Sequence, residues 1–487
     1  MVKCKKWMAV MMAAVCTVSL AGCGGGKTAD KGQEGAQTQQ AGAQKNDAQK
    51  TDGQNSDTRK TEAPAAAEGK VTVSYWTTNR HDQEYMTKKI EEFNNTNDAI
   101  YIDYQVYADN YSQMLDLAFS TDTAPDVFQI IDFPLYHEKG YMLDLAPYMD
   151  EEYKARFGDG AFVEGINSYG DAIYSMPYTA SAARLFYNKD IFERVGIEAP
   201  PKTLDEMVAD AKLITEQLGK EGIYGFAGNF KSAASSINRT VDVIVQRSGG
   251  TRGGYDYQAG KYDFTSYKPV LEAFQAILAG GAGFPGSESL DIDPLRTQFA
   301  AGNIGMYMSV SHAEPGVYTS QFPTDVNWDC AQIPTVSGNV DGKQNLWFGG
   351  NYAAINTGTA HPDEAWEVMK FLYSDEVMGE YYSLGLGTVM IPSAIKDVTP
   401  PATIEKMPNL AINDDDKNWP PLPINVVVEG KDYTALSVEC IFGMADIDKT
   451  IEDLNKRYNE AYEKSIANGE ERVIYPNFDP LNQNTSK

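Results

Sequence analysis

Residues 24–69 contain no valine, isoleucine, leucine, methionine, phenylalanine, tyrosine or tryptophan. Glycine, alanine, glutamine, lysine, aspartate, threonine and asparagine dominate this stretch, and such a composition cannot bury enough apolar surface to offset the entropy lost on folding. We therefore expect residues 23–69 to form a disordered linker. As a flexible coil, the 46 residues 24–69 have a root-mean-square span of roughly 35–40 Å. The folded body must then lie after this linker, from residue 70 onward.

The residues before this linker have the pattern of an export signal. A positively charged start is followed by an uncharged, largely apolar stretch of 14 residues, Trp7 to Leu20. This stretch is shorter than the roughly 20 residues that a membrane-spanning helix needs, and it suits the apolar region of a cleaved signal peptide. The sequence Leu20-Ala21-Gly22-Cys23 resembles the bacterial lipobox. This resemblance implies that residues 1–22 are a lipoprotein signal peptide and that Cys23 carries the lipid, palmitate included.

A lipid on Cys23 predicts where the protein resides. Two acyl chains give the two hydrophobic signals that stable membrane anchoring needs. Gly24 and Gly25 follow the cysteine, so no acidic retention residue stands at the second position. We expect a lipid-anchored protein on the extracellular face of the cell membrane, in a Gram-positive-type envelope. The alternative is an ordinary signal peptide that happens to contain a cysteine.

Charge and cysteine content exclude several classes of protein. The net charge is −27, and it becomes −30 once the three lysines of the signal are removed. A chain this acidic cannot neutralise phosphates, so we expect no nucleic-acid partner. Beyond the signal and Cys23, only Cys330 and Cys440 remain. They form either one bridge or two buried thiols, and no disulfide framework is predicted.

The body alternates strand and helix patterns. Val71 to Trp76 and Ile100 to Val106 alternate in the manner of strands, and helical spacing follows each of them. The apolar run Val127 to Ile131 is typical of a strand buried on both faces. This order predicts an α/β fold with mainly parallel sheets covered by helices. Because about 417 residues exceed what a single core supports, two lobes are expected.

Several segments in one order resemble a known family, the extracellular solute-binding proteins of sugar ABC importers, which include maltose-binding protein. The segments are Ala124-Pro125-Asp126-Val127, Met176-Pro177-Tyr178, Tyr187-Asn188-Lys189-Asp190, Pro200-Pro201-Lys202-Thr203, Phe299–Met306 and Gly349–Ala353. The resemblance extends over roughly residues 70–465. The pair Tyr-Asn-Lys-Asp and Pro-Pro-Lys-Thr is its most specific part.

The resemblance implies a two-lobed periplasmic-binding-protein-like fold of type II, with a hinge of three crossing segments near 178–183, 325–332 and 374–380. The expected lobes are discontinuous: residues 70–180 and 328–376 for the N-terminal lobe, and 181–327 and 377–487 for the C-terminal lobe. A mono- or oligosaccharide would bind between the lobes and be delivered to the permease subunits of an ABC importer. We expect a monomer that is not an enzyme and needs no cofactor or metal.

Ligands of open α/β sheets bind at the carboxyl ends of strands, and this rule selects candidate ligand contacts without reference to any family. Family members contact sugar in the same regions. Planar polar groups suit neighbouring hydroxyls, and aromatic rings suit the apolar faces of a pyranose. The candidates are Trp76, Thr77, Asn79, Arg80, Asp132, Tyr178, Ser181, Arg184, Asn229, Phe230, Ser309, His312, Trp347, Gly349, Gly350 and Asn351.

Three other functions stay open at this stage. Tyr381-Tyr382 is similar to the paired tyrosines of iron-binding relatives, so ferric iron is an alternative solute. A secreted glycoside hydrolase needs two carboxylates about 5–10 Å apart, and the 68 acidic residues do not exclude such a pair. A tethered surface adhesin would explain the linker but not the order of the motifs.

Overall fold

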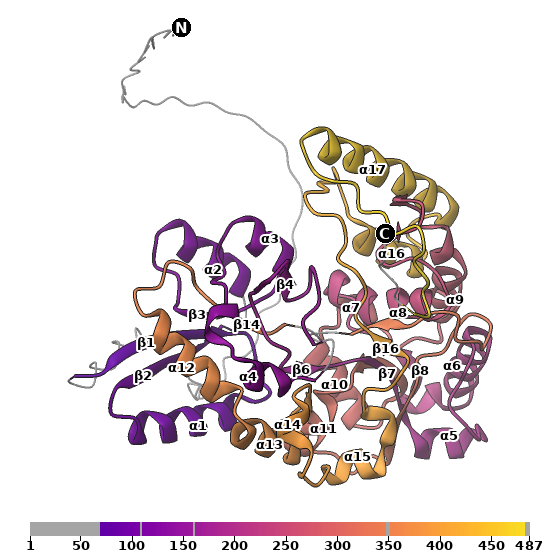
Figure 1. The fold of residues 1–487 in the computed structure, drawn as a ribbon. Helices are drawn as coiled ribbons and strands as arrows, with labels where there is room; N and C mark the ends of the chain where they lie inside the picture. The colour runs from indigo at the N-terminus through magenta and orange to yellow at the C-terminus, as the bar shows by residue number, and fades with distance from the viewer. Residues whose placement is uncertain (1–68, 108–109, 159–160, 347–350, 483–487) are drawn as a thin grey trace, which may run out of the picture. The chain divides into compact units, whose positions relative to one another are not determined.

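The computed structural model describes residues 69–107, 110–158, 161–346 and 351–482. The predicted signal peptide, Cys23 and the linker up to residue 68 lie outside the described residues, as do Trp347, Gly349 and Gly350. The described elements form two α/β lobes within one compact unit (Figure 1). None of the helices in these parts of the chain combines the length and apolar character that crossing a bilayer requires.

The first lobe is built on a four-stranded sheet in the order β14-β3-β1-β2. Its strands are β1 (Val71–Thr77), β2 (Ile100–Val106), β3 (Val127–Gln129) and β14 (Ala353–Ile355). β2 and β3 run parallel to β1, while β14 runs antiparallel to β3. The strands predicted near 71, 100 and 127 are therefore confirmed, and the carboxyl ends of β1 and β3 lie at the same edge.

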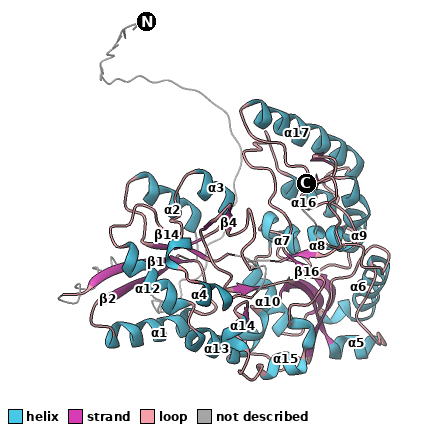
Figure 2. Cartoon of the chain, in the orientation of Figure 1, coloured by secondary structure: helices cyan, strands magenta, loops and turns pink. Residues whose placement is uncertain are grey.

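Helices cover both faces of this sheet (Figure 2). On one face, Val73 and Tyr75 of β1 pack with Met86, Trp366 and other buried apolar residues of α1, α12 and α13. On the opposite face, Phe128 packs in a second cluster with residues of α2 and α3. The helices are α1 (Gln83–Thr96), α2 (Tyr111–Ser120), α3 (Phe133–Glu138), α4 (Glu151–Ala155), α12 (Pro362–Leu372), α13 (Asp375–Ser383) and α14 (Pro392–Ile395).

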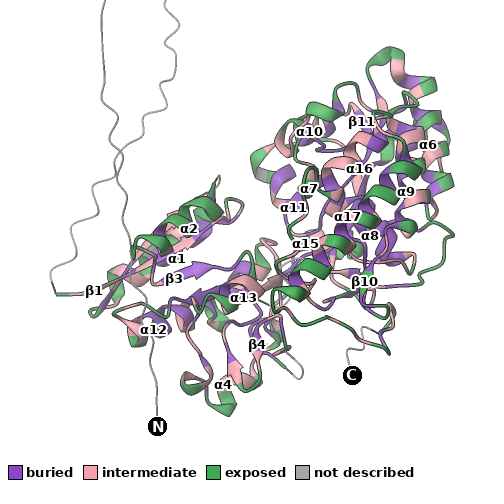
Figure 3. Ribbon diagram, turned by 90° about the horizontal axis from the view of Figure 1, so that it is seen from above, coloured by how far each residue is buried: buried purple, intermediate pink, exposed green. Residues whose placement is uncertain are grey.

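The second lobe contains a sheet in the order β12-β7-β11-β8. Its strands are β7 (Ala183–Asn188), β8 (Tyr224–Ala227), β11 (Ile304–Val310) and β12 (Trp328–Ala331). Every residue of β11 is buried, because clusters of apolar side chains cover both faces of this sheet. Buried residues gather between the strands and helices of this lobe (Figure 3).

The helices of the second lobe are α5 (Lys189–Val195), α6 (Leu204–Leu218), α7 (Ala233–Arg239), α8 (Val241–Arg247), α9 (Lys268–Leu278), α10 (Ile292–Ala300), α11 (Glu314–Gly316), α15 (Ala402–Lys406), α16 (Tyr433–Ile441) and α17 (Ile447–Ala467). The capping box at the start of α6 is confirmed. The Glu206 N–H donates to Thr203 Oγ1 at 3.1 Å, and the Thr203 N–H donates to Glu206 Oε2 at 3.1 Å. Cys330 in β12 and Cys440 in α16 are both free, buried thiols.

Two-stranded pairs complete the described sheets. They are β4 (Ser168–Tyr169) with β5 (Ala172–Ile173), β6 (Thr179–Ala180) with β15 (Thr388–Val389), β9 (Tyr255–Asp256) with β10 (Lys261–Tyr262), and β13 (Gln344–Asn345) with β16 (Asp416–Lys417). Ala180, Ala182 and Leu346 form a small apolar cluster where the chain passes between the lobes.

Two of the predicted lobe boundaries differ from the structure. Residues 328–331 form β12 and pair with β7 of the second lobe, although they were assigned to the first. Residues 377–394 belong to the first lobe, because Val377, Met378 and Ala394 are buried in its core. Tyr352 already lies in the core of the first lobe, and the chain leaves that core after Ala394. The crossing predicted at 325–332 is wrong because residues 328–331 pair with a strand of the second lobe. The crossing predicted at 374–380 is wrong because the apolar face of α13 (375–383) packs in the first lobe.

Candidate functional site

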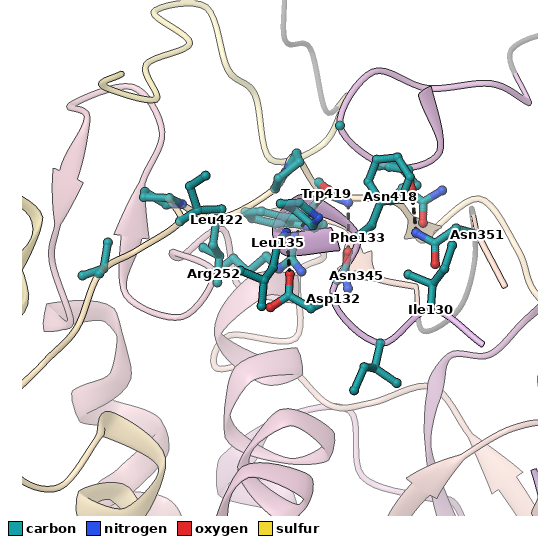
Figure 4. Close-up of a pocket in the computed structure, with 18 of the residues that line it drawn as sticks. Ile130, Asp132, Phe133, Leu135, Arg252, Asn345, Asn351, Asn418, Trp419 and Leu422 are labelled. Atoms are coloured by element: carbon teal, nitrogen blue, oxygen red, sulfur yellow. Dashed lines mark hydrogen bonds between the residues drawn. The ribbon is translucent and has the colours of Figure 1, made fainter. Parts of the chain in front are cut away.

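A cavity of about 570 Å³ is lined by residues of both lobes (Figure 4). This volume falls within the range of small-molecule sites in proteins. The first lobe contributes residues 130–135, Gly165, Ile166 and Asn351. The second lobe contributes Arg252, Asn345, Leu346, Asn418, Trp419 and residues 421–426.

Asp132 follows β3 and lines the cavity from the first lobe. Its Oδ1 accepts a hydrogen bond from the Leu135 N–H at 3.1 Å, so the side chain also caps α3. Its second carboxylate oxygen can still accept a hydrogen bond from a ligand. Asn351 lines the same side, and its Nδ2 donates to the Ile166 carbonyl at 2.6 Å, which points to the amide oxygen as its ligand-binding group. The first lobe therefore offers hydrogen-bond acceptors.

Trp419 forms the opposite wall and is buried. Its Nε1–H donates to the Lys343 carbonyl at 2.7 Å, and its backbone N–H donates to Asn345 Oδ1 at 2.9 Å. Arg252 lies beside it and donates from Nη1 to the Pro420 carbonyl at 2.7 Å. These bonds fix the guanidinium and the indole on the second lobe. The indole is 2% exposed and packs on Tyr257 and Phe478, so it supports this wall from within the core, and Arg252 is the cation that the wall offers to a ligand.

A second, much smaller cavity of about 10 Å³ is lined by Asn79, His81, Thr179, Ala180, Ser181, His312 and Tyr352. This volume is close to that of one water molecule. The rings of His81 in the first lobe and His312 in the second lie with their centroids 5.0 Å apart, edge to face. Three candidate ligand contacts, Asn79, Ser181 and His312, therefore come together here rather than in the large cavity.

Burial lowers the pKa of His312 well below its ordinary value, and the positive potential of His81, Arg239 and Arg296 adds to this effect. The ring is accordingly neutral at physiological pH. On the other side of the small cavity, His81 Nε2 lies 3.1 Å from the Tyr381 hydroxyl, which itself donates to Asp82 Oδ2 at 2.9 Å. Since that hydroxyl proton is committed to Asp82, His81 Nε2 is the donor to Tyr381.

Arg184 lies outside both cavities and is fully buried. A guanidinium has five N–H donors. In Arg184 they meet Asp416 twice, at 2.7 and 3.1 Å, and the carbonyls of Asn409, Ala183 and Ala411. This arrangement leaves no N–H for a ligand and makes Arg184 part of a buried ion pair.

Other candidates also have partners within the protein. Thr77 donates to Gln129 Oε1 at 2.7 Å, and Ser309 donates to Glu314 at 2.5 Å. Trp76 packs against Tyr107 with ring centroids 4.7 Å apart, and Tyr178 stacks on Tyr352 at 4.1 Å. Asn229 bonds Ser235, Phe230 packs on Phe442 in the second core, and Arg80 is exposed. None of these residues is among the described residues that line either cavity.

Sequence reasoning missed Arg252, Asn345 and the whole segment from Asn418 to Val426. Asn418 and Trp419 follow β16, which fits the rule that ligands meet the carboxyl ends of strands. However, β16 is only two residues long, so no alternation of apolar and polar residues marks it. The signal that could have found this wall is Trp419-Pro420-Pro421-Leu422-Pro423, an aromatic residue that leads into a proline-rich loop.

In the described parts of the chain, no group of three or more His, Cys, Asp or Glu side chains is placed to hold a metal ion. Of the three consecutive aspartates 414–416, Asp415 pairs with Lys343 at 2.9 Å and Asp416 with Arg184 at 2.7 Å, so these two carboxylates are engaged in ion pairs.

Comparison with known proteins identifies the family. The family model described as bacterial extracellular solute-binding protein matches residues 77–379, more than half of the chain. The chain belongs to this family. A binding protein of Brucella abortus is 24% identical to this solute-binding protein over 328 residues, which span 64% of this chain and 74% of that protein. The diacetylchitobiose-binding protein of Streptomyces coelicolor is 23% identical over 273 residues, spanning 55% of this chain and 60% of the relative.

Solved structures agree with the family. The solute-binding protein RafE in complex with raffinose aligns with a TM-score of 0.63 and 20% identity over 80% of this chain and 100% of RafE. The sugar-binding protein MalE of Xanthomonas citri aligns with a TM-score of 0.60 and 17% identity over 82% of this chain and 100% of MalE. At these identities the structures show the fold, and the predicted two-lobed fold of type II is confirmed.

Proposed function

We propose that this solute-binding protein captures a carbohydrate in the large cavity and delivers it to an ABC importer. The observation that carries the proposal is the composition of the cavity wall. Asp132 and Asn351 offer planar acceptors on one lobe, while Arg252 offers a donor and the half-buried Leu422 an apolar surface on the other. A pyranose has hydroxyl groups at its rim and apolar C–H faces, and these match the two kinds of surface.

The names of the relatives support a sugar as the solute. The relatives include proteins named for binding diacetylchitobiose and multiple sugars, and a structure in complex with raffinose. A ligand held between two lobes stabilises the closed arrangement through the contacts that it makes only there. The proposed cycle is reversible capture, closure, and release to the permease subunits.

The anchor remains part of this proposal. A lipid on Cys23 and a linker of residues 23–69 would hold the binding body near the permease on the extracellular face of the membrane, as a monomer. Mass spectrometry of the protein purified from membranes tests this point, because a diacylglyceryl modification on an N-terminal Cys23 is expected. An unmodified N-terminus after residue 22 would reject the anchor.

A glycoside hydrolase is the weaker alternative. Such an enzyme needs a pair of carboxylates on either side of the scissile bond. Among the described residues that line the large cavity, Asp132 is the one carboxylate. Reversible binding therefore fits this wall better than bond cleavage does.

Ferric iron is also a weaker fit. A tyrosine binds ferric iron as phenolate, but burial and the nearby Asp82 raise the pKa of Tyr381 well above its ordinary value. Its hydroxyl also donates to Asp82, and the side chain is 1% exposed. Tyr381 is thus held as a neutral phenol inside the first lobe.

The test is calorimetric titration of the protein with a panel of mono-, di- and oligosaccharides, together with product analysis after long incubation. A saccharide present at 100 times its Kd should raise the free energy of unfolding by about 2.7 kcal/mol. Cleavage of the bound sugar would reject the binding-protein proposal in favour of a hydrolase. Ferric binding with a tyrosinate charge-transfer band would reject the sugar.

A further inference from the structure

The segment between β16 and α16 is a long stretch without regular structure. It runs over residues 418–432, 15 residues that contain three prolines at its start. Irregular loops of this length are uncommon in compact lobes and are usually functional. Residues 421–426 line the large cavity, and Val427 is 79% exposed. We name residues 420–428 the proline strap.

The start of the proline strap is fixed to the second lobe. The Pro420 carbonyl accepts hydrogen bonds from Tyr257 at 2.6 Å and from Arg252 at 2.7 Å. Proline also fixes its own backbone φ, so Pro420, Pro421 and Pro423 limit how far the chain can deviate from its path. The strap therefore projects from a rigid base.

The second residue of the strap, Pro421, touches the first lobe. A Cβ placed on Gly165 would lie 2.7 Å from Pro421 Cγ, a distance that side-chain atoms do not tolerate. Gly165 also has φ +74, in the left-handed region that favours glycine. The two lobes therefore approach each other at Gly165 and Pro421 so closely that a side chain on residue 165 would separate them.

Beyond this contact, one amide joins the two lobes. Asn425 Nδ2 donates to Glu138 Oε2 of α3 in the first lobe at 3.1 Å. The same nitrogen donates to Glu470 Oε1, which follows α17 in the second lobe, at 2.9 Å. Asn425 has φ 56, a left-handed conformation that asparagine tolerates better than most residues do. In this backbone conformation, the Asn425 amide contacts the Glu138 carboxylate of the first lobe and the Glu470 carboxylate of the second.

The charges around Asn425 explain why the bridge is an amide. Glu138 and Glu470 carry like charges, and two carboxylates near the same point repel each other. The Nδ2 group supplies two N–H donors, one for each carboxylate, without adding charge of its own. Loss of the amide would leave the two acidic groups facing each other across the cleft.

We propose that the proline strap is a lid on the large cavity, and that Asn425 latches it to the first lobe through Glu138. That a ligand lies beneath the lid depends on the proposed function, but the latch between the lobes does not. Glu138 and Asn425 are 287 positions apart in sequence, so this bond is a contact between distant segments of the chain and not a local feature of the strap.

Hydrogen exchange of the ligand-free full chain, purified in detergent and read by mass spectrometry, tests the latch. Glu138→Ala should speed amide exchange of residues 424–428 and of residues 165–166 about 2–5-fold, as expected when one exposed hydrogen bond is lost. Glu138→Gln keeps an acceptor oxygen and should restore exchange to nearly the wild-type rate. Glu84→Ala, an exposed carboxylate on α1 of the same lobe, is the matched control and should leave these peptides unchanged.

A second comparison separates the latch from a local disturbance. Asn425→Ala should speed exchange at residues 165–166 of the first lobe. Adding Glu138→Ala should not speed it further, because the Asn425–Glu138 bond is already absent from the Asn425→Ala variant. Strap exchange in Glu138→Ala equal to that in Glu84→Ala would overturn the latch. If saccharides fail to bind while Glu138→Ala still frees the strap, the proposed function falls and the latch stands.

Discussion

Replacement of Arg184 by methionine tests whether this residue serves the fold or the ligand. The guanidinium and the Asp416 carboxylate are both fully buried, with a closest distance of 2.7 Å. Methionine fills a similar volume but leaves Asp416 charged and without its cationic partner, although Gln344 and the Asn413 N–H still donate to it. Breaking a buried pair in this way costs about 3–5 kcal/mol, because the remaining charge stays in a medium of low polarity. We therefore expect the free energy of unfolding to fall by about that amount.

The assay is urea denaturation followed by circular dichroism. Arg194→Met provides the matched control, since Arg194 pairs with Glu221 at the same distance of 2.7 Å but both side chains are about half exposed. An exposed pair contributes only about 0–1 kcal/mol, so this control should unfold nearly as the wild type does. The double variant Arg184→Met with Asp416→Asn should recover part of the loss, because it no longer buries an unpaired charge.

Ligand binding distinguishes the two roles of Arg184. All five of its N–H groups are used within the protein, so the folded Arg184→Met variant should bind the sugar with nearly wild-type affinity. A variant that loses less than about 1 kcal/mol of stability but loses ligand affinity would refute the reasoning. In that case the guanidinium would have to exchange its internal partners for the ligand.

Three further predictions concern the cavity and its surroundings. Asp132→Ser keeps a capping oxygen for α3 but removes the carboxylate, so calorimetry should show sugar affinity about 10-fold or more lower with little change in melting temperature. Gly165→Ala should destabilise the protein and weaken sugar binding more than Gly170→Ala does, because both glycines have positive φ but only Gly165 faces Pro421. Equal effects of the two substitutions in calorimetry would argue against the contact between the lobes. Burial and neighbouring positive charge lower the pKa of His312. As pH falls below about 6.5, the unfolded chain should therefore take up a proton at residue 312 that the folded protein does not. Urea titrations should show the free energy of unfolding falling by up to about 1.4 kcal/mol per pH unit, and His312→Asn should remove this effect.

The regular elements could be predicted because each carries a local signal. The alternating residues of β1, the continuous apolar run of β3 and the capping box of α6 depend on side chains close together in sequence. Lobe boundaries carry no such signal. Whether residues 328–331 join the second sheet depends on pairing with β7, about 140 positions earlier in the chain. Such long-range pairing is not encoded in local spacing.

The candidate site was only partly predictable for a related reason. The strand-end rule found Asp132, whose position after β3 places it at the cavity, and it also selected Arg184, at the start of β7. In sequence the two look alike, since each is a charged residue next to a strand. They differ because the guanidinium of Arg184 pairs with Asp416, which lies 232 positions away in sequence. A polar residue is available to a ligand only where the fold leaves one of its donors or acceptors unused, as it does for the second carboxylate oxygen of Asp132.

The same reasoning applies to the second wall of the cavity. Arg252 is held by the Pro420 carbonyl, and the buried Trp419 beside it is held by the Lys343 carbonyl and by Asn345, so this wall is rigid before any ligand arrives. Asp132 and Asn351 lie on the other lobe and can meet that surface through a ligand between them. A sugar that bridges these groups makes contacts in the closed arrangement of the lobes that it cannot make in the open one. The resulting difference in binding free energy between the two arrangements can drive closure. The Asn425–Glu138 bond acts on the same equilibrium without a ligand. It must therefore be weak, because a latch worth much more than about 1.4 kcal/mol would hold the cleft shut in more than nine molecules out of ten and slow the entry of the sugar.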